Sequence, residues 1–312
     1  MIRLMDLKID YAFKKLFAKL GNEPILLAFV NAALDPSEEE RVTWIELVNN
    51  EQSRERIGDK MSVLDLLART ERGMYVNIEI QLANEHDMER RSLYYWSRVY
   101  TGQMSQGMSY QELKRTITIN ILNFRYMKQT DDYHTRFHVA EDEDGFMLTE
   151  VLEMHFMELP KLMDRWQRGQ ASPEENLLAR WLLLLEADDH EDIRERLWAI
   201  AKEDEAMKKA FEQWEEVSQD VESWAVYEHR RKVVLDELAK VREAELRELA
   251  AHERGVAEGL EQGLEQGLEQ GIEQSKRAMA RGLIAKGVEV ELIAEVTGLS
   301  LAVIETLRNE LN

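Results

Sequence analysis

Apolar and polar residues alternate most clearly between residues 60 and 81, KMSVLDLLARTERGMYVNIEIQ. The first half of this stretch is an apolar, β-rich run with one carboxylate, Asp65. Gly73 separates the two halves, at a position where a tight turn favours a residue that tolerates positive φ. The pattern therefore predicts a β-hairpin.

The second half of the hairpin has a period of two residues. Asn77, Glu79 and Gln81 occupy every second position. Because successive side chains of a strand point to opposite faces, these three polar residues share one face. The other face is predicted to be apolar, with Val76, Ile78 and Ile80.

Further elements are predicted on both sides of the hairpin. Asp6 is expected to cap the first helix, and Asp35 with Pro36 to end the second. The predicted elements are helices over residues 6–20, 24–34 and 86–108, strands over 41–49 and 116–124, and two strands within 133–160 around an acidic turn.

From residue 161 the pattern becomes helical, and residues 166–250 are predicted to be an accessory helical region. Within residues 251–275, glycine then recurs every four residues and is followed by Leu or Ile in the last four repeats. Each glycine costs a helix about 1 kcal/mol relative to alanine, so a stripe of them favours a helix that packs against another one. The alternative is a semi-flexible spacer.

Residues 276–312 form the last predicted region. Ala294, Gly298 and Ile304 have the spacing of a helix-turn-helix, but the second helix offers only Arg308 as a cation. DNA-reading helices need several donors, so a small protein-interaction module is favoured over a DNA-binding one.

Composition narrows the class of protein. The 312 residues include no cysteine, which excludes a disulfide scaffold and thiol chemistry. No apolar run approaches the ~20 residues of a membrane span, and the first residues lack a signal-peptide pattern, so a cytoplasmic protein without membrane contact is expected. The net charge of −21 lies entirely after residue 130, since residues 1–130 hold equal numbers of acids and bases. The first part is therefore compatible with DNA binding.

The two acids of the hairpin are the candidate chemistry. A carboxylate in an apolar strand is costly unless a metal ion or a donor compensates it. Asp65 and Glu79 on neighbouring strands would provide oxygen ligands for Mg²⁺, or for Mn²⁺. The spacing alone is weak evidence, because acids occur at such distances by chance in many hairpins.

The chain resembles the Rpn/YhgA-like recombination-promoting nucleases, also called PD-(D/E)xK nuclease family transposases. The resemblance covers roughly residues 1–165 and rests on DYAFKKLF, SVLDLLA, NIEIQ, RSLYYWSRVYTGQM and YQELKRTITINIL, in that order. It implies an α/β, restriction-endonuclease-like core followed by an α-helical C-terminal region. Leu64 stands where the motif has Pro, and Gln81 where it usually has Lys, a replacement that is common in this family.

The resemblance also implies roles for single residues. The catalytic set would be Asp65, Glu79 and Gln81, with the main-chain carbonyl of Ile80 as a further metal ligand. Asp10 stands where the first helix of such enzymes lends an acid to the metal. An ion pair with Lys14, four residues on, is the alternative role for Asp10. Lys60 is placed to reach a phosphate or simply to be solvated.

Basic residues near the aromatic ones are candidates for binding the DNA backbone. Arg90 and Arg91 accompany the aromatic residues of the third predicted helix, and Lys114 and Arg115 precede the strand over 116–124. The aromatic stripe itself is more typical of a core. His134 and His138 are predicted to be structural.

Together these observations predict a Mg²⁺-dependent DNA endonuclease, linked to recombination, mobile elements or phage, that forms homo-oligomers through its C-terminal helices. Two alternatives stay open: a non-catalytic interaction protein that keeps the fold, and a nuclease controlled by its own C-terminal part.

Overall fold

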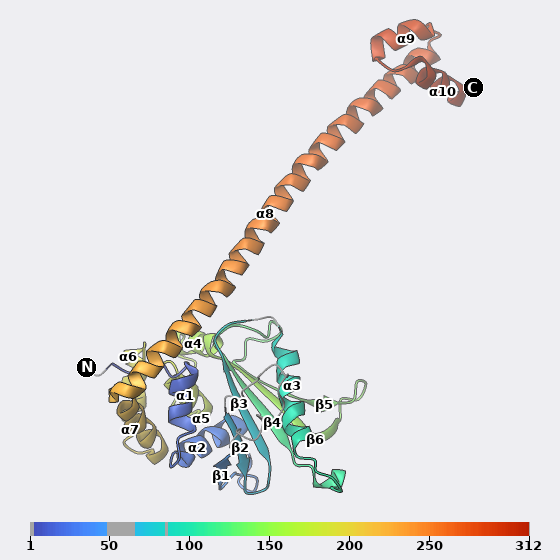
Figure 1. The fold of residues 1–312 in the computed structure, drawn as a ribbon. Helices are drawn as coiled ribbons and strands as arrows, with labels where there is room; N and C mark the ends of the chain where they lie inside the picture. Colours follow the sequence, from blue (N-terminus) through green and yellow to red (C-terminus); the bar gives the residue numbers. More distant parts are fainter. Residues whose placement is uncertain (1–2, 49–65, 85–86, 312) are drawn as a thin grey trace. The chain divides into compact units, whose positions relative to one another are not determined.

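The computed structural model describes residues 3–48, 66–84 and 87–311. Asp65 and Lys60 lie outside these residues. The chain divides into two compact units, Met1–Val241 and Arg242–Asn312, and the boundary falls within one long helix, α8. Figure 1 shows the elements of both units.

The first unit is built on a six-stranded mixed sheet with the order β1-β2-β3-β4-β6-β5. The two central pairs, β3 with β4 and β4 with β6, are parallel, and the other pairs are antiparallel. The strands are β1 (Ile45–Leu47), β2 (Leu66–Thr70), β3 (Tyr75–Gln81), β4 (Thr116–Leu122), β5 (His134–Ala140) and β6 (Met147–Glu158). The predicted hairpin, the strand over 116–124 and the two strands around an acidic turn are all present.

Two helices cover one face of the sheet and a third covers the other (Figure 1). Helices α1 (Asp10–Phe17) and α2 (Glu23–Leu34) pack on the isoleucines and valines of β3 and β4. Helix α3 (Met88–Gly102) lies on the opposite face and contacts β4 and β3. Each face of β3 is therefore covered by a different helix. For this reason the side chains on both faces of the strand are buried, except at its two ends.

The hairpin turn forms as its sequence predicts. Gly73 has φ +77°, and its N–H donates to the Thr70 carbonyl at 2.9 Å. The N–H of Thr70 donates to the carbonyl of Met74, also at 2.9 Å, which closes the turn. A residue with a Cβ would be strained at this φ, so glycine fixes the turn and with it the register of β2 and β3.

Three predicted boundaries need correction. Helix α1 begins at Asp10, its N-cap is Ile9, and Asp6 does not cap it. Residues 7–9 form a turn instead, in which the Asp6 carboxylate accepts from the N–H of Lys8 at 2.8 Å. Just before this turn, Ser218 accepts from the N–H of Met5 at 3.0 Å. Strand β1 is shorter than the predicted 41–49, and α3 ends at Gly102 rather than near residue 108.

The remaining helices of the first unit join the apolar side of the sheet. A short 3₁₀ helix, Tyr110–Glu112, precedes β4. The buried side chains of the remaining α-helices, including Trp214 and Phe211, belong to the same core as α1 and α2. These helices are α4 (Leu159–Gln167), α5 (Leu177–Leu184), α6 (Glu191–Ile200), α7 (Glu205–Gln219) and the first turns of α8 (Val221–Ala285).

The second unit has a small core of its own, where the end of α8 meets α9 (Val290–Thr297) and α10 (Leu301–Leu311). Gly298, with φ +68°, ends α9, and its N–H donates to the carbonyl of Ala294 at 2.9 Å. The buried residues are Ala280, Ile293, Leu299, Ile304 and Leu307. Within the described ranges no helix has the length and apolar character to cross a membrane.

Candidate functional site

Glu79 is a carboxylate at the centre of the sheet. Its strand, β3, pairs with β2 on one side and with β4 on the other. The residue is only 3 % exposed. The Nδ2 group of Asn77 donates a hydrogen bond to Glu79 Oε1 at 3.2 Å. An acid this deeply buried in a strand needs compensation, which makes the surroundings of Glu79 the first place to look for a site.

A buried polar seam lies beside Glu79, under α3. Asn120 on β4 is the register partner of Glu79 and is 1 % exposed. Its Oδ1 accepts from Ser92 Oγ of α3 at 2.8 Å, and its Nδ2 donates to the carbonyl of His155 on β6 at 3.0 Å. Asn120 thereby ties helix α3 to both parallel strand pairs next to the acid.

Two polar atoms of this seam have no hydrogen-bond partner in the described part of the chain. They are Oδ1 of Asn77 and Oγ1 of Thr118, and both residues are fully buried. Asn77 and Thr118 are register partners on β3 and β4, one step along the strands from Glu79 and Asn120. Buried polar groups are nearly always hydrogen-bonded, so two such atoms side by side next to a buried acid need an explanation, and a bound ion is one.

The oxygen atoms at this place suit a hard divalent cation. The carboxylate of Glu79, the Oδ1 of Asn77 and the main-chain carbonyl of Ile80 are all oxygen donors, the ligands that Mg²⁺ prefers. Within residues 3–48, 66–84 and 87–311, no three His, Asp or Glu side chains gather closely enough to hold a metal ion. The second predicted carboxylate, Asp65, immediately precedes β2 in the sequence but lies outside the described residues.

Other predicted site residues lie on neighbouring elements. Gln81 ends β3 and is half-buried, and its carbonyl accepts from the N–H of Asn123 at 2.9 Å. Asp10 and Lys14 lie one turn apart on α1 and are both half-buried. Helix α1 packs mainly against α2 and α7.

The arginines at the start of α3 lie at the same end of the sheet as Glu79. Ser92 bonds to the register partner of Glu79, so Arg90 and Arg91, which precede it, belong to this end. Arg90 is exposed. Arg91 Nε donates to the hydroxyl of Tyr95 at 3.1 Å, and its guanidinium lies 5.5 Å from the Tyr95 ring centroid.

Lys114 and Arg115 lie at the other end. They precede Thr116, which pairs with Tyr75 at the start of β3, four residues before Glu79. At about 3.3 Å per residue, Thr116 is roughly 13 Å along the strands from the acid, and Arg115 and Lys114 are roughly 17 and 20 Å from it. Arg115 is moreover ion-paired with the buried carboxylate of Glu153. The structure thus separates the two pairs of basic residues that the sequence grouped together.

Glu153 belongs to a second buried polar cluster, at the β5–β6 side of the sheet. His155 Nε2 donates to Glu153 Oε1 at 2.9 Å, and His134 Nε2 lies 2.8 Å from His155 Nδ1. An ionised carboxylate can only accept, so the chain of donors runs from His134 through His155 to Glu153. The predicted structural role of His134 agrees with this position. The cluster itself could not be found from sequence, because its members come from separate segments.

The charges of this cluster shift two pKa values strongly. Burial favours the neutral acid at Glu153, but the hydrogen bond from His155 and the charges of His155 and Arg115 outweigh it and lower the pKa of Glu153 to about 2. Burial lowers the pKa of His134 to about 4, with smaller contributions from the charges of His155 and Arg136.

Comparison with known proteins now identifies the class of chain. The family described as "PD-(D/E)XK nuclease family transposase" matches residues 7–244, more than half of the sequence. The chain belongs to this family. The resemblance and the fold class predicted from the motifs are therefore confirmed. No curated protein and no solved structure matches the sequence. Membership of a PD-(D/E)XK nuclease family supports a nuclease-type function, implies DNA as the substrate, and agrees with the general use of divalent metal ions by such enzymes.

Proposed function

We propose that this PD-(D/E)XK protein is a Mg²⁺-dependent DNA endonuclease that hydrolyses phosphodiester bonds in recombination or mobile-element processes in the cytoplasm. The observation that carries the proposal is Glu79, a buried carboxylate on the strand between β2 and β4, beside an amide oxygen of Asn77 that has no partner among the described residues. The family match supports the class of reaction.

Asp65, Glu79 and the Ile80 carbonyl would hold the metal. Bound Mg²⁺ would supply Lewis-acid chemistry, by polarising the scissile phosphate and lowering the pKa of a water. Asn77 holds the Glu79 carboxylate through the 3.2 Å hydrogen bond. Gln81 cannot take up or release a proton near neutral pH, so its amide orients the attacking water or binds a phosphate oxygen.

Arg90 and Arg91 are the proposed contacts to the DNA backbone near the scissile phosphate. Their place at the start of α3, at the Glu79 end of the sheet, supports this role. The second pair, Lys114 with Arg115, would contact DNA only farther along the strands, and Arg115 would first have to leave Glu153.

The test is nicking of supercoiled plasmid by the full-length protein with Mg²⁺, with Mn²⁺ and with EDTA. We expect cleavage with either metal and none with EDTA. Asp65→Ala should reduce the rate by ~10²-fold or more, as loss of a group that stabilises the transition state does. Glu46→Gln is the matched control, because Glu46 is an exposed acid on β1 of the same sheet. Wild-type rates from Asp65→Ala would remove it from the metal site. Absence of any cleavage would favour the non-catalytic interaction protein.

We further propose that residues 255–274 of α8 bind a second copy of the chain. Apart from the nearby backbone of the helix itself, no heavy atom of the described residues lies within 4 Å of where a Cβ would stand at Gly259, Gly263 or Gly267. The flanking Leu264 and Leu268 are each 67 % exposed. Five glycines cost about 5 kcal/mol of helix stability, which packing against a second helix would offset.

Sedimentation velocity of the full chain and of a chain lacking residues 252–312 tests this association. The full chain should be oligomeric at tens of micromolar and the shortened one smaller in subunit number. Leu264→Glu in the full chain should also lower the number of subunits, whereas Glu265→Gln, one residue away, should leave it unchanged. A monomeric full-length protein would make the repeat a spacer.

A further inference from the structure

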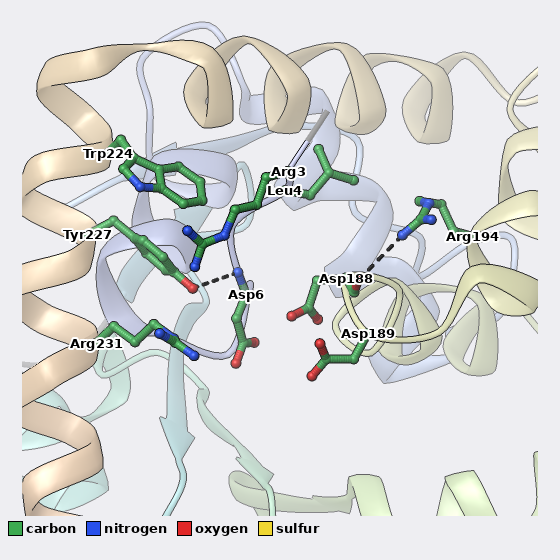
Figure 2. A pocket seen from close by; sticks show the side chains of 9 residues that line it. All are labelled: Arg3, Leu4, Asp6, Asp188, Asp189, Arg194, Trp224, Tyr227 and Arg231. Carbon is green, nitrogen blue, oxygen red and sulfur yellow. Dashed lines mark hydrogen bonds between the residues drawn. The ribbon is translucent and has the colours of Figure 1, made fainter. Parts of the chain in front are cut away.

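A cavity of about 300 Å³ lies in the first unit, away from the β3 and β4 strands that carry the nuclease residues. Three segments form it: the residues before α1, the loop between α5 and α6 with the start of α6, and the first turns of α8 (Figure 2). Such a volume is at the lower end of the range for small-molecule sites. The cavity is lined almost entirely by charged and aromatic side chains, which sets the kind of ligand it can hold.

One wall of the cavity carries an excess of negative charge. The Nζ of Lys8, a residue only 6 % exposed, lies 3.1 Å from Asp6, 3.3 Å from Glu186 and 3.4 Å from Asp188. A single ammonium group thus faces three carboxylates. Asp189 lines the cavity together with Asp6 and Asp188, and no ion pair is found for Asp189 among the described residues. Partly buried charges that exceed their counter-charges leave room for a cationic group.

The loop that carries these acids is held by its backbone. The Nη1 of Arg194 donates to the carbonyls of Ala187 at 3.1 Å and Asp188 at 3.4 Å. Arg194 therefore fixes the loop and does not neutralise its carboxylates. Burial, followed by the charge of Asp6, raises the pKa of Asp188 to about 6, as expected for an acid with too little positive charge around it.

The opposite wall has the reverse character. Arg3 and Arg231 share one carboxylate, Glu228, at 3.2 and 3.8 Å, so this wall holds two guanidinium groups for one acid. The guanidinium of Arg3 lies over the Trp224 ring, 4.8 Å from its centroid. Figure 2 shows Arg3 and Arg231 on the α8 side and the two loop acids across the cavity from them.

Tyr227 adds a directed donor to the basic wall. It is 3 % exposed and lines the cavity. Its hydroxyl oxygen accepts from the N–H of Asp6 at 3.0 Å (Figure 2). The hydroxyl proton is not used in that bond, and it is left to donate to an acceptor on a ligand.

We propose that this cavity binds a small zwitterion, an α-amino acid with a free ammonium and a free carboxylate group. Asp188 and Asp189 would receive the ammonium group, and Arg231 with the Tyr227 hydroxyl would receive the carboxylate. A ligand of either charge alone would satisfy one wall and be repelled by the other, whereas the zwitterion matches both. The aromatic side of the cavity would contact its side chain.

The experiment uses the full-length protein without DNA or metal, so its outcome does not depend on the proposed nuclease function. Each of the twenty common L-α-amino acids is screened by thermal shift, and hits are measured by isothermal titration calorimetry. At least one should bind saturably, while acetate and methylamine at equal concentration and ionic strength should not. Binding by no amino acid, or binding of methylamine as tight as that of the amino acid, would overturn the proposal.

Single-charge variants locate the binding. Asp188→Asn and Arg231→Gln should each raise the Kd of the tightest-binding amino acid at least tenfold. Asp142→Asn, an exposed acid in the β5–β6 turn, is the control and should bind like wild type. Because Asp188 is part of the Lys8 cluster, the folding of the Asp188→Asn variant is verified by far-UV circular dichroism. Asp189 is exposed, so Asp189→Asn serves as a second variant on the same wall. Unchanged affinity in folded Asp189→Asn and Arg231→Gln would contradict the assignment.

Discussion

Two glutamates, Glu79 on β3 and Glu153 on β6, are buried in the same sheet to nearly the same extent, 3 % and 1 % exposed. Glu153 lies among two arginines and two histidines: Arg115 and His155 bond to it, and Arg136 and His138 lie 3.7 and 3.8 Å away. On the described strands beside Glu79, the cross-strand pairs Glu79–Asn120 and Asn77–Thr118 bring neutral amide and hydroxyl groups next to the acid.

This difference supports the proposed metal-binding role of Glu79 and a structural role of Glu153. The charges around Glu153 hold its pKa near 2 and bind β4, β5 and β6 together. Next to Glu79, the Oδ1 of Asn77 and the Oγ1 of Thr118 have no hydrogen-bond partner within the described part of the chain. Proteins keep buried oxygens without partners at places where function needs them. The arrangement at Glu79 is therefore suited to bind a cation from solution.

The largest expected effect on stability comes from Glu153→Gln. Removing the charge leaves Arg115 and Arg136 without their carboxylate, and breaking a buried pair in this way typically costs 3–5 kcal/mol. Because both arginines are partly exposed, we expect a loss of about 3 kcal/mol in the free energy of unfolding, measured by urea denaturation. Glu79→Gln should change stability much less.

The control for this comparison is Glu150→Gln, an exposed acid on the same strand, which should stay within about 0.5 kcal/mol of wild type. Equal destabilisation by Glu79→Gln and Glu153→Gln would mean that both acids are structural, and the contrast between them would be lost.

Acidification should weaken the Glu153 cluster through His134. The pKa of His134 is lowered to about 4 in the folded protein from its usual 6.5. The unfolded chain therefore binds more protons between these values, so the stabilising effect of neutral His134 is complete above pH 6.5 and is lost as the pH falls towards 4. We expect the wild type to lose on the order of 1–2 kcal/mol from this residue between pH 7.5 and 5, after allowance for solvent screening.

Urea denaturation at both pH values measures this loss. In His134→Gln the difference between the two pH values should shrink by that amount, whereas His229→Gln, which alters an exposed histidine of the same unit, should leave it unchanged. The same pH dependence in wild type and His134→Gln would show that His134 does not titrate in this window.

The smallest expected effect concerns Gln81, at the end of β3. If its amide orients water or phosphate, Gln81→Ala should reduce plasmid nicking by about tenfold, a positioning effect of roughly 1.4 kcal/mol. Gln81→Lys restores the common motif and should keep or raise the rate. Nicking by Gln81→Ala at the wild-type rate would leave Gln81 without a role.

The local features of the site could be predicted from sequence. The period of two residues places Asn77, Glu79 and Gln81 on one face, and Gly73 takes the positive φ that its turn needs. Both follow from neighbouring residues, because alternation and turn chemistry are short-range properties.

Features that depend on distant segments could not be predicted. Ser92 and Asn120 meet only because α3 packs on β4, and Glu153 meets Arg115 only because β6 pairs with β4. Asn120 within the apolar run TITINIL was the one available signal for the seam, since an amide in a fully buried strand needs a partner.

The same reason explains why Asp6 does not cap helix α1. Asp6 has the sequence of a helix cap, but Ser218 of α7 and Tyr227 of α8 bind the N–H groups of Met5 and Asp6, and a turn separates Asp6 from the helix. Lys114 precedes β4 as predicted, and only the parallel pairing of β3 and β4 shows that it lies at the end of the strands farther from Glu79.

The measurement that tests the central claim most directly is the rate of Mg²⁺-dependent plasmid nicking by Glu79→Gln, beside wild type, Glu153→Gln and Glu46→Gln, at a temperature where all four are folded. We predict a loss of ~10²-fold or more for Glu79→Gln, with Glu153→Gln and Glu46→Gln within a few-fold of wild type. Cleavage by folded Glu79→Gln at the wild-type rate would contradict the assignment of Glu79 as the metal-binding acid of this nuclease.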